Sequence, residues 1–249
     1  MHIDINCDLG EGTDLSSCGR DAQIMSFISR CNIACSGHAG TPEIMERSIE
    51  NALHANLKIG AHPSYPDRDN FGRESIAISP ERLLESLCEQ ISQLTSIARQ
   101  LETELDHIKL HGALYNDAEA NIQLAENITT LFAGEYPSLK ILGLANGAME
   151  TAASGQGRVF IREGFMDRQY LNESQLAPRS LPKALITDTA KCLNQATCLA
   201  KNLPFKDYYG GKLQFNVDTI CLHGDSPQAP ALAEQLTHYF MANGLSIDR

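Results

Sequence analysis

The chain has 249 residues, 43% of them hydrophobic, which is enough for one sizeable core, and its formal net charge at pH 7 is −11. This acidic charge excludes the class of nucleic-acid-binding proteins, because phosphate groups are bound mainly by clustered Lys and Arg. No apolar run approaches the roughly 18 residues of a membrane span and residues 1–6 do not resemble a signal peptide, so we expect a cytoplasmic protein with a single domain, residues 1–249, and no membrane partner.

Residues 2–8 alternate between polar and apolar side chains, which is the period of a β-strand. Asp4, Asn6 and Asp8 fall on one face, and apolar residues occupy the other. A face with two carboxylates and an amide suits no packed apolar core, so it indicates a strand that lines a polar site. The turn that follows, residues 9–12, holds two glycines that allow close approach of a ligand.

The rest of the chain alternates between short strands and helices. In chain order we predict strand 31–35, a helix from Thr41-Pro42, strand 57–61, helix 79–101, strand 107–110, helix 121–134, strand 140–144, a short helix to about 154, strand 158–161, helix 187–202, strand 219–222 and helix 227–242. About seven such units predict a parallel sheet, closed as a barrel or doubly wound. Polar residues follow at least five strands, which favours the barrel. The sequence contains neither a G-x-G-x-x-G after the first strand nor a P-loop.

Four of the eight histidines stand where predicted strands end: His38, His62, His111 and His223. Any one of them alone is better explained as a structural histidine. Because parallel strands all end on one side of a barrel, the four should meet at one mouth. Histidine exchanges protons near neutral pH, so at least two are predicted to be functional.

Three charged residues are further catalytic candidates. Asp8 and Glu11 follow the first strand at a glycine-bounded turn, where they could act as a general base or bind an amine or a metal ion, or simply be solvated. Lys109 stands two residues before His111, so in an extended chain both side chains project to the same face. There Lys109 would contact a substrate carboxylate or stabilise an oxyanion; the alternative is a surface lysine at a strand edge.

Several loops could close over this mouth. Their candidate residues include Tyr65, Asp67, Arg73, Asp167, Arg168 and Tyr170. Arg73 or Arg168 would suit a bidentate grip on a carboxylate or phosphate, although each could equally hold its own loop together. The expected substrate-binding set also includes Asn6, Tyr115, Asn116 and Asp225. For Asp225, capping of the following helix is as good an explanation. The eight cysteines include no C-x-x-C pair and are expected to be reduced core residues.

Six motifs, in order along nearly the whole chain, resemble the LamB/YcsF family. They are N-C-D-L-G-E-G at 6–12, N-I-A-C-x-x-H-A-G at 32–40, I-G-A-H-P-S-Y-P-D at 59–67 with F-G-R at 71–73, H-G-A-L-Y-N at 111–116, D-R-x-Y at 167–170 and H-G-D-S-P at 223–227. The resemblance implies a (β/α) barrel of glycoside hydrolase and deacetylase type. It also implies ATP-dependent hydrolysis of 5-oxoproline to L-glutamate together with two partner subunits.

The chain departs from the family's usual pattern at three positions. Gly37, Thr41 and Leu110 replace an aromatic residue, a carboxylate and a proline, respectively. These changes concern the substrate more than the fold, so another lactam remains an alternative. Two further functions also stay open: a metal-dependent deacetylase or amidohydrolase that needs no ATP, and a ligand-binding subunit without catalysis of its own. The sequence decides neither whether a divalent metal ion is bound nor whether the chain forms a homo-oligomer.

Overall fold

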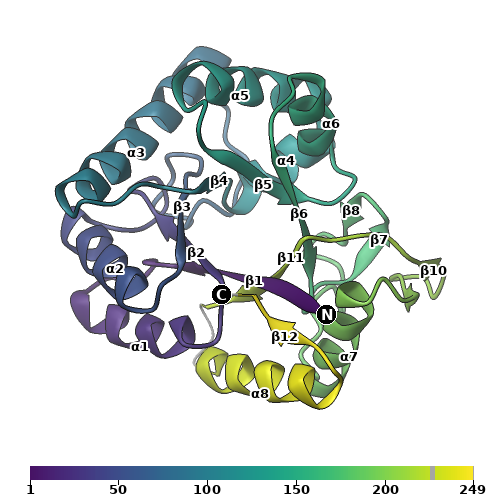
Figure 1. The fold of residues 1–249 in the computed structure, drawn as a ribbon. Helices are drawn as coiled ribbons and strands as arrows, with labels where there is room; N and C mark the ends of the chain where they lie inside the picture. Colours follow the sequence, from purple (N-terminus) through teal and green to yellow (C-terminus); the bar gives the residue numbers. More distant parts are fainter. Residues whose placement is uncertain (225–227, 249) are drawn as a thin grey trace.

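The strands close into a barrel in the computed structural model, with helices packed around its outside (Figure 1). The structure describes residues 1–224 and 228–248. Within them, seven strands follow each other around the barrel in the order β11-β6-β5-β4-β3-β2-β1, and β1 pairs again with β11 to close the circle. All these pairings are parallel. The predicted barrel of about seven parallel strands is therefore confirmed.

The barrel strands are β1 (His2–Leu9), β2 (Arg30–Ala34), β3 (Lys58–His62), β4 (His107–Lys109), β5 (Lys140–Leu144), β6 (Phe160–Phe165) and β11 (Thr219–His223). Five short strands of the described residues lie outside it: β7 (Tyr170–Asn172), β8 (Gln175–Leu176), β9 (Phe205–Lys206), β10 (Lys212–Leu213) and β12 (Ser246–Ile247). β7 pairs with β8 and β9 with β10, both antiparallel, whereas β12 pairs with the beginning of β1.

The described helices are α1 (Leu15–Met25), α2 (Pro42–His54), α3 (Pro80–Gln100), α4 (Gly112–Ala120), α5 (Ile122–Glu135), α6 (Ala148–Gly155), α7 (Thr189–Ala200) and α8 (Ala229–Ala242). Side-chain oxygens of Thr41 and Ser79 accept hydrogen bonds from the first turns of α2 and α3, as expected of N-caps before proline. The start expected for the last helix, at residue 227, lies outside the described residues.

Two helices were not expected from the sequence. α1 contains two serines and a glycine, and only Cys18, Ile24 and Met25 supply its buried apolar side chains, so its periodicity is weak. Its N-terminus is instead fixed by Asp14, whose carboxylate accepts from the backbone N–H groups of Ser16 and Ser17. α4 begins at Gly112, three residues after the end of β4, in a stretch for which the sequence pattern predicts no helix.

The sixth barrel strand is longer than predicted. The prediction ended it at residue 161, before two charged residues, but β6 continues to Phe165. Arg162 is matched outside the barrel by Asp218, at 2.7 Å, and Glu163 points into the barrel, where its side chain is fully buried. A charged residue can therefore continue the strand because each charge meets an opposite charge.

The interior of the barrel is polar. Arg30 donates to Asp4 at 2.8 Å, and Asn32 donates to Asn6 at 2.9 Å and to Asp8 at 2.8 Å. Barrels of this type usually have interiors dominated by branched apolar side chains. Here these buried polar groups find partners on other strands of the barrel, which avoids the cost of leaving them unsatisfied. The alternation in residues 2–8 correctly predicted this polar face.

The apolar core lies between the barrel and its helices. Ile3, Ile5, Cys7 and Leu9 of β1 belong to it, together with the buried stripes of the helices. For example, α3 contributes Leu87, whose side chain is fully buried. All eight cysteines are free, and six of them are buried, as predicted.

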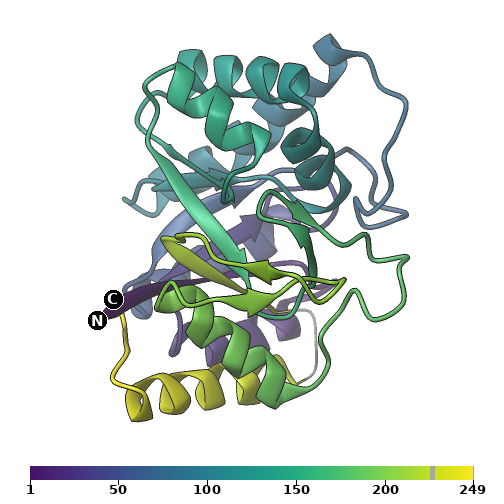
Figure 2. The same ribbon diagram turned by 90° about the vertical axis from the view of Figure 1, so that its right-hand side faces the viewer.

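The functional end of the barrel is the one where the strands finish. Figure 2 shows both termini on the left of the barrel, while the connections that follow the strands, such as the green segment between β6 and α7, extend to the right. Register places the strand ends at one level, since Asp8 is paired with both His223 and Asn32. Among the described residues, none of the helices is both long and apolar enough to cross a membrane.

Candidate active site

A small cavity opens where the strands end. Its volume is about 80 Å³, and its lining includes Asp8, Glu11, His62, Lys109, His111 and His223, which are six of the seven predicted catalytic residues. These six residues come from β1, β3, β4 and β11 and from the connections after them, separated by more than 200 positions in the chain. The histidines therefore converge at one mouth, as predicted. His62, His111 and His223 line the cavity, and the ring of His38 packs against that of His111.

At the bottom of this cavity, Lys109 is held between two carboxylates. Its ammonium nitrogen lies 3.0 Å from Asp8 Oδ1 and 2.7 Å from Glu163 Oε1, and only 2% of the side chain is exposed. It also donates to Asn6 at 3.0 Å and approaches Cys221 Sγ at 3.4 Å. Three ammonium protons thus face four acceptors, so Lys109 can donate to a substrate oxyanion only by releasing one of them.

The charges of this group stabilise one another. Burial alone would raise the pKa of Asp8, but His62 and Lys109 lower it well below its usual range. Burial would likewise lower the pKa of Lys109, whereas Asp8, Cys221 and Glu163 raise it well above its usual value. Asp8 therefore stays ionised, which suits a residue that orients Lys109 and His62 better than one that takes a proton from water.

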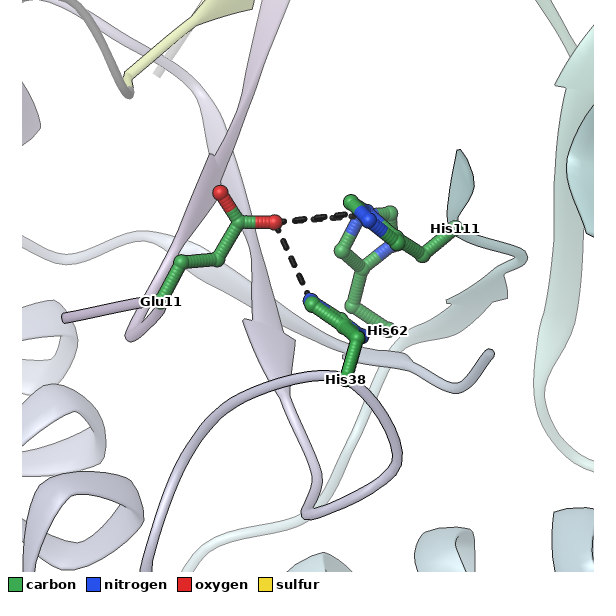
Figure 3. Close-up of side chains that lie close together, drawn as sticks. All are labelled: Glu11, His38, His62 and His111. Atoms are coloured by element: carbon green, nitrogen blue, oxygen red, sulfur yellow. Dashed lines mark hydrogen bonds and ion pairs between the residues drawn. The ribbon is translucent and has the colours of Figure 1, made fainter. Parts of the chain in front are cut away.

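Glu11 and three histidines form a second group at the side of the cavity (Figure 3). Glu11 Oε1 lies 3.1 Å from His38 Nε2, 3.3 Å from His111 Nδ1 and 3.9 Å from His62 Nε2. The rings of His38 and His111 are stacked with centroids 3.6 Å apart. Burial lowers the pKa of His38 and of His111 well below the usual value, so both imidazoles are neutral.

On the opposite wall, His223 is bound to an aspartate. Its Nδ1 lies 2.6 Å from Asp167 Oδ2, and its Nε2 lies 3.4 Å from Arg179 Nη2. Burial would lower the pKa of His223, but the Asp167 carboxylate raises it above the usual value. The raised pKa suits His223 as a proton donor, in contrast to the neutral imidazoles of His38 and His111.

A buried arginine borders the same cavity. Arg168 is 4% exposed, and its Nη2 donates to the carbonyl oxygen of Ala177 at 2.8 Å. None of the described carboxylates lies within ion-pair distance of it, and its Nε has no partner among the described residues. Burial and the neighbouring Arg179 lower the pKa of its guanidinium. Arg168 also lines an adjoining cleft of about 690 Å³, to which Arg73 and Arg179 contribute two more guanidinium groups.

The remaining predicted substrate-binding residues differ in position. Arg73, Tyr115 and Asn116 line the cavity. Asn6 lies beneath Asp8 inside the barrel, where Asn32 and Lys109 donate to it.

Two loop residues turn away from the cavity lining. Tyr65 donates its hydroxyl proton to Asp117 at 2.9 Å, and Asp67 accepts from the side chain of Asn70 at 3.1 Å. The first contact ties the loop to α4, and the second holds the loop itself together. Asp225 lies outside the described residues.

Two residues of the site were not expected from the sequence. The predicted strand ends at residue 161 and leaves Glu163 in a loop, whereas the period-2 pattern continued past Arg162 places Glu163 inside the barrel. Arg179 comes from an irregular connection and carries no local signal. Its position beside His223 follows only from the folded chain.

The loop before α4 positions His111 through a close contact between two glycines. Gly112 has a φ of +59°, and a Cβ atom there would lie 2.3 Å from the carbonyl oxygen of Gly72. That segment also holds His111, whose Nε2 lies 3.0 Å from the carbonyl oxygen of Phe71. The glycine is therefore needed for both backbone conformation and space.

We expect Gly112→Ala to lower the free energy of unfolding by about 1–3 kcal/mol, because the added methyl group must push backbone rather than a flexible side chain. Chemical denaturation measures this. Gly134→Ala is the control, since nothing lies within 4 Å of the added Cβ in α5 and alanine favours the helix. Equal stability of the two variants would contradict the expectation.

The fold and this cavity define a class: a (β/α) barrel with a site built from carboxylates, histidines and arginines at the carboxyl ends of its strands. Within that class the chain belongs to the LamB/YcsF family, whose profile matches residues 3–249.

Individual members of the family are similar to this chain over nearly its full length. A protein of Bacillus cytotoxicus that is named as a subunit of 5-oxoprolinase is 37% identical over 99% of this chain and 98% of its own. A protein with the same name from Chloroflexus aggregans is also 37% identical, over 99% and 98%. The crystal structure of a lactam utilization protein from Thermus thermophilus is 31% identical, covers 99% of both chains and superposes with a TM-score of 0.90.

A more distant structure shares the fold alone. A putative cellobiose-phosphate cleavage protein from Enterococcus faecalis is 13% identical and has a TM-score of 0.61, with 100% of this chain and 97% of the other covered.

Proposed function

We propose that the chain is the component of a cytoplasmic 5-oxoprolinase that opens the ring of 5-oxoproline to give L-glutamate, with ATP and two partner subunits. The names of its full-length relatives support the substrate. The observation that carries the proposal is the single cavity that Glu11, Lys109, His111, His223 and Arg168 line together, since hydrolysis of an amide needs these kinds of group at one place.

Each wall of the cavity has a different part in this reaction. The group of Glu11, His62 and His111 is placed to activate the attacking water. His223, held by Asp167, is the acid that supplies a proton to the leaving nitrogen of the ring. Asp8 and Lys109 keep an ionised pair between them, which fixes both and sets the electrostatic field in which an oxyanion develops.

Arg168 is the clamp for the carboxylate of the substrate. Its guanidinium is buried and lacks a carboxylate partner among the described residues, and 5-oxoproline would bring that missing charge. Arg179 and Arg73 border the same wall and the adjoining cleft. The anion-attracting wall therefore faces the histidines across a cavity in which the ring can lie.

ATP is needed because the five-membered lactam is a stable amide, and converting its carbonyl oxygen into a better leaving group lowers the barrier to ring opening. The chain has no P-loop motif, so we assign nucleotide handling to the partner subunits.

The test is reconstitution. The purified chain, its two partner subunits, ATP and 5-oxoproline are mixed, and glutamate and ADP are measured together. We expect glutamate only when all components are present, and omission of this chain to abolish it. Absence of glutamate above background in the complete mixture would refute the proposal.

A second candidate function, amide hydrolysis without ATP, is favoured by one observation: Glu11 and three histidines converge as metal ligands do. The same assay separates the two functions. Turnover of a lactam or an N-acetyl substrate by the chain alone, without ATP or partners, would support the second candidate and contradict the first.

A further inference from the structure

The histidines beside Glu11 have their ring protons fixed by backbone carbonyl groups. His62 Nδ1 lies 2.8 Å from the carbonyl oxygen of Lys109, and His111 Nε2 lies 3.0 Å from that of Phe71. A carbonyl oxygen only accepts hydrogen bonds, so each of these nitrogens carries a proton. The other nitrogens, His62 Nε2 and His111 Nδ1, lie 3.0 Å apart, so one of them donates a hydrogen bond to the other.

Two further ligand atoms face the same point. Glu11 Oε1 and His38 Nε2 are 3.1 Å apart, and all four atoms lie within 4.8 Å of one another. One proton between His62 and His111 and one on His38 suffice to hold this group together without a metal. A divalent cation would replace both protons and contact all four atoms at once.

We propose that Glu11, His38, His62 and His111 bind one divalent transition-metal ion of the zinc type. Zinc bound to nitrogen at about 2.0–2.1 Å in a tetrahedron places its ligands roughly 3.3 Å apart. Three of the ligand pairs lie at 3.1, 3.3 and 3.0 Å. Three imidazoles and one carboxylate suit zinc, nickel or cobalt, whereas magnesium and calcium prefer oxygen ligands.

His38 is the ligand that must turn. Its ring is stacked on that of His111 with 6° between the planes, so one ion cannot lie in the plane of both rings. The other two histidines are held by carbonyl groups, but His38 Nδ1 has no hydrogen-bond partner among the described residues although the side chain is 2% exposed. Rotation of His38 therefore breaks its stacking on His111 and one hydrogen bond, that with Glu11, which the metal replaces.

The surroundings favour a cation and give it access. Asp8 Oδ2 lies 3.4 Å from His62 Nε2 and adds a second negative charge beside the site. Glu11, His62 and His111 line the cavity, so an ion can enter from it and a bound water can face the substrate. A zinc-type ion at this place would polarise a carbonyl group or lower the pKa of bound water.

The experiment measures metal binding without substrate, so its result does not depend on the proposed reaction. The full-length chain is treated with a chelator, dialysed and titrated with Zn²⁺ in a calorimeter, and Co²⁺ binding is followed by visible absorption. We expect one equivalent of each, with the spectrum of a low-coordinate Co²⁺ site. Glu11→Gln keeps the volume of the side chain but removes its charge. We expect it to weaken Zn²⁺ binding by at least about 100-fold, because loss of a residue that only hydrogen-bonds to a metal ligand already lowers metal affinity about 10–100-fold.

His54→Ala is the control, since His54 lies exposed at the end of α2 and its one hydrogen bond within the described part of the chain goes to Glu50 of the same helix. It should bind Zn²⁺ as the wild type does. His38→Gln is the second test, and circular dichroism and the unfolding midpoint of each metal-free variant establish that it is folded. Failure of the wild type to bind either ion stoichiometrically, or binding that both folded variants retain, would overturn the proposal.

Discussion

Replacing Lys109 with methionine is expected to lower the free energy of unfolding by about 3–5 kcal/mol and to abolish activity. Methionine fills much of the same volume, so the loss is electrostatic rather than steric. Lys109 is the cation between the Asp8 and Glu163 carboxylates, at 3.0 and 2.7 Å, and Glu163 is fully buried. Removing one partner of a buried ion pair leaves a charge without compensation, which costs this much in other proteins. Denaturant titration followed by circular dichroism measures the change.

Lys58→Met provides the matched control. Lys58 also faces an aspartate, Asp4, but at 3.8 Å and with 41% of its side chain exposed, so its removal should cost less than about 1 kcal/mol. A second variant identifies the cause: Lys109→Met combined with Glu163→Gln should recover part of the lost stability, because one of the two unpaired charges is gone. A loss for Lys109→Met as small as that for Lys58→Met would contradict the expectation.

The sequence predicted the barrel because two of its signals are local. The alternation of Asp4, Asn6 and Asp8 with apolar residues is a property of one strand, and it gave both the strand and its polar inner face. The repetition of strand and helix then implied parallel strands, which bring all strand ends to one side. That geometric step alone placed four distant histidines in one region: His38, His62 and His111 contact one another, and His223 lines the same cavity as His62 and His111.

The parts that were missed depend on contacts between segments. Glu163 looks like a loop residue until its partner Lys109, 54 positions earlier, is known to face it across the barrel. α1 has a weak apolar stripe, and it is held by packing on α2 and by an aspartate cap rather than by propensity. Tyr65 is of a residue type that often binds ligands, yet its hydroxyl group donates a hydrogen bond to Asp117 on α4. Composition indicates which residues could act, but only the partner of each polar atom shows which remain available.

The polar interior explains how the site is held in position. The atoms at its base, Asp8 and Lys109, are fixed by Asn6 and Asn32, and Asn32 is in turn bound by His107 at 2.7 Å. Such a network costs desolvation but fixes each side chain in one orientation, which a packed apolar interior could not do for charged groups. Part of the stability of this barrel is therefore used to preorganise the cavity.

Arg168 should show most clearly that a residue of the cavity can serve binding without adding to stability. Its guanidinium is buried without a carboxylate partner among the described residues, so in the absence of substrate it contributes little to folding. We expect Arg168→Met to change the free energy of unfolding by no more than about 1 kcal/mol. The same variant should raise KM for 5-oxoproline by about 10- to 100-fold in the reconstituted enzyme, because a hydrogen bond to a charged group contributes about 1.5–3 kcal/mol.

A substrate without the carboxylate distinguishes a clamp from a general defect. 2-Pyrrolidinone has the same lactam ring but lacks the carboxylate, so if the wild-type enzyme turns it over or is inhibited by it, Arg168→Met should leave that interaction within about twofold. Arg82→Met is the control variant, since Arg82 lies exposed on α3 and, among the residues that the structure describes, forms an ion pair only with Glu85 of the same helix. Equal losses for the two ligands, or a large loss of stability, would make Arg168 a structural residue. If Arg168→Met weakens binding of 5-oxoproline but not of 2-pyrrolidinone, the carboxylate of 5-oxoproline lies on the wall that holds Arg168. The lactam ring then faces the histidines on the opposite wall.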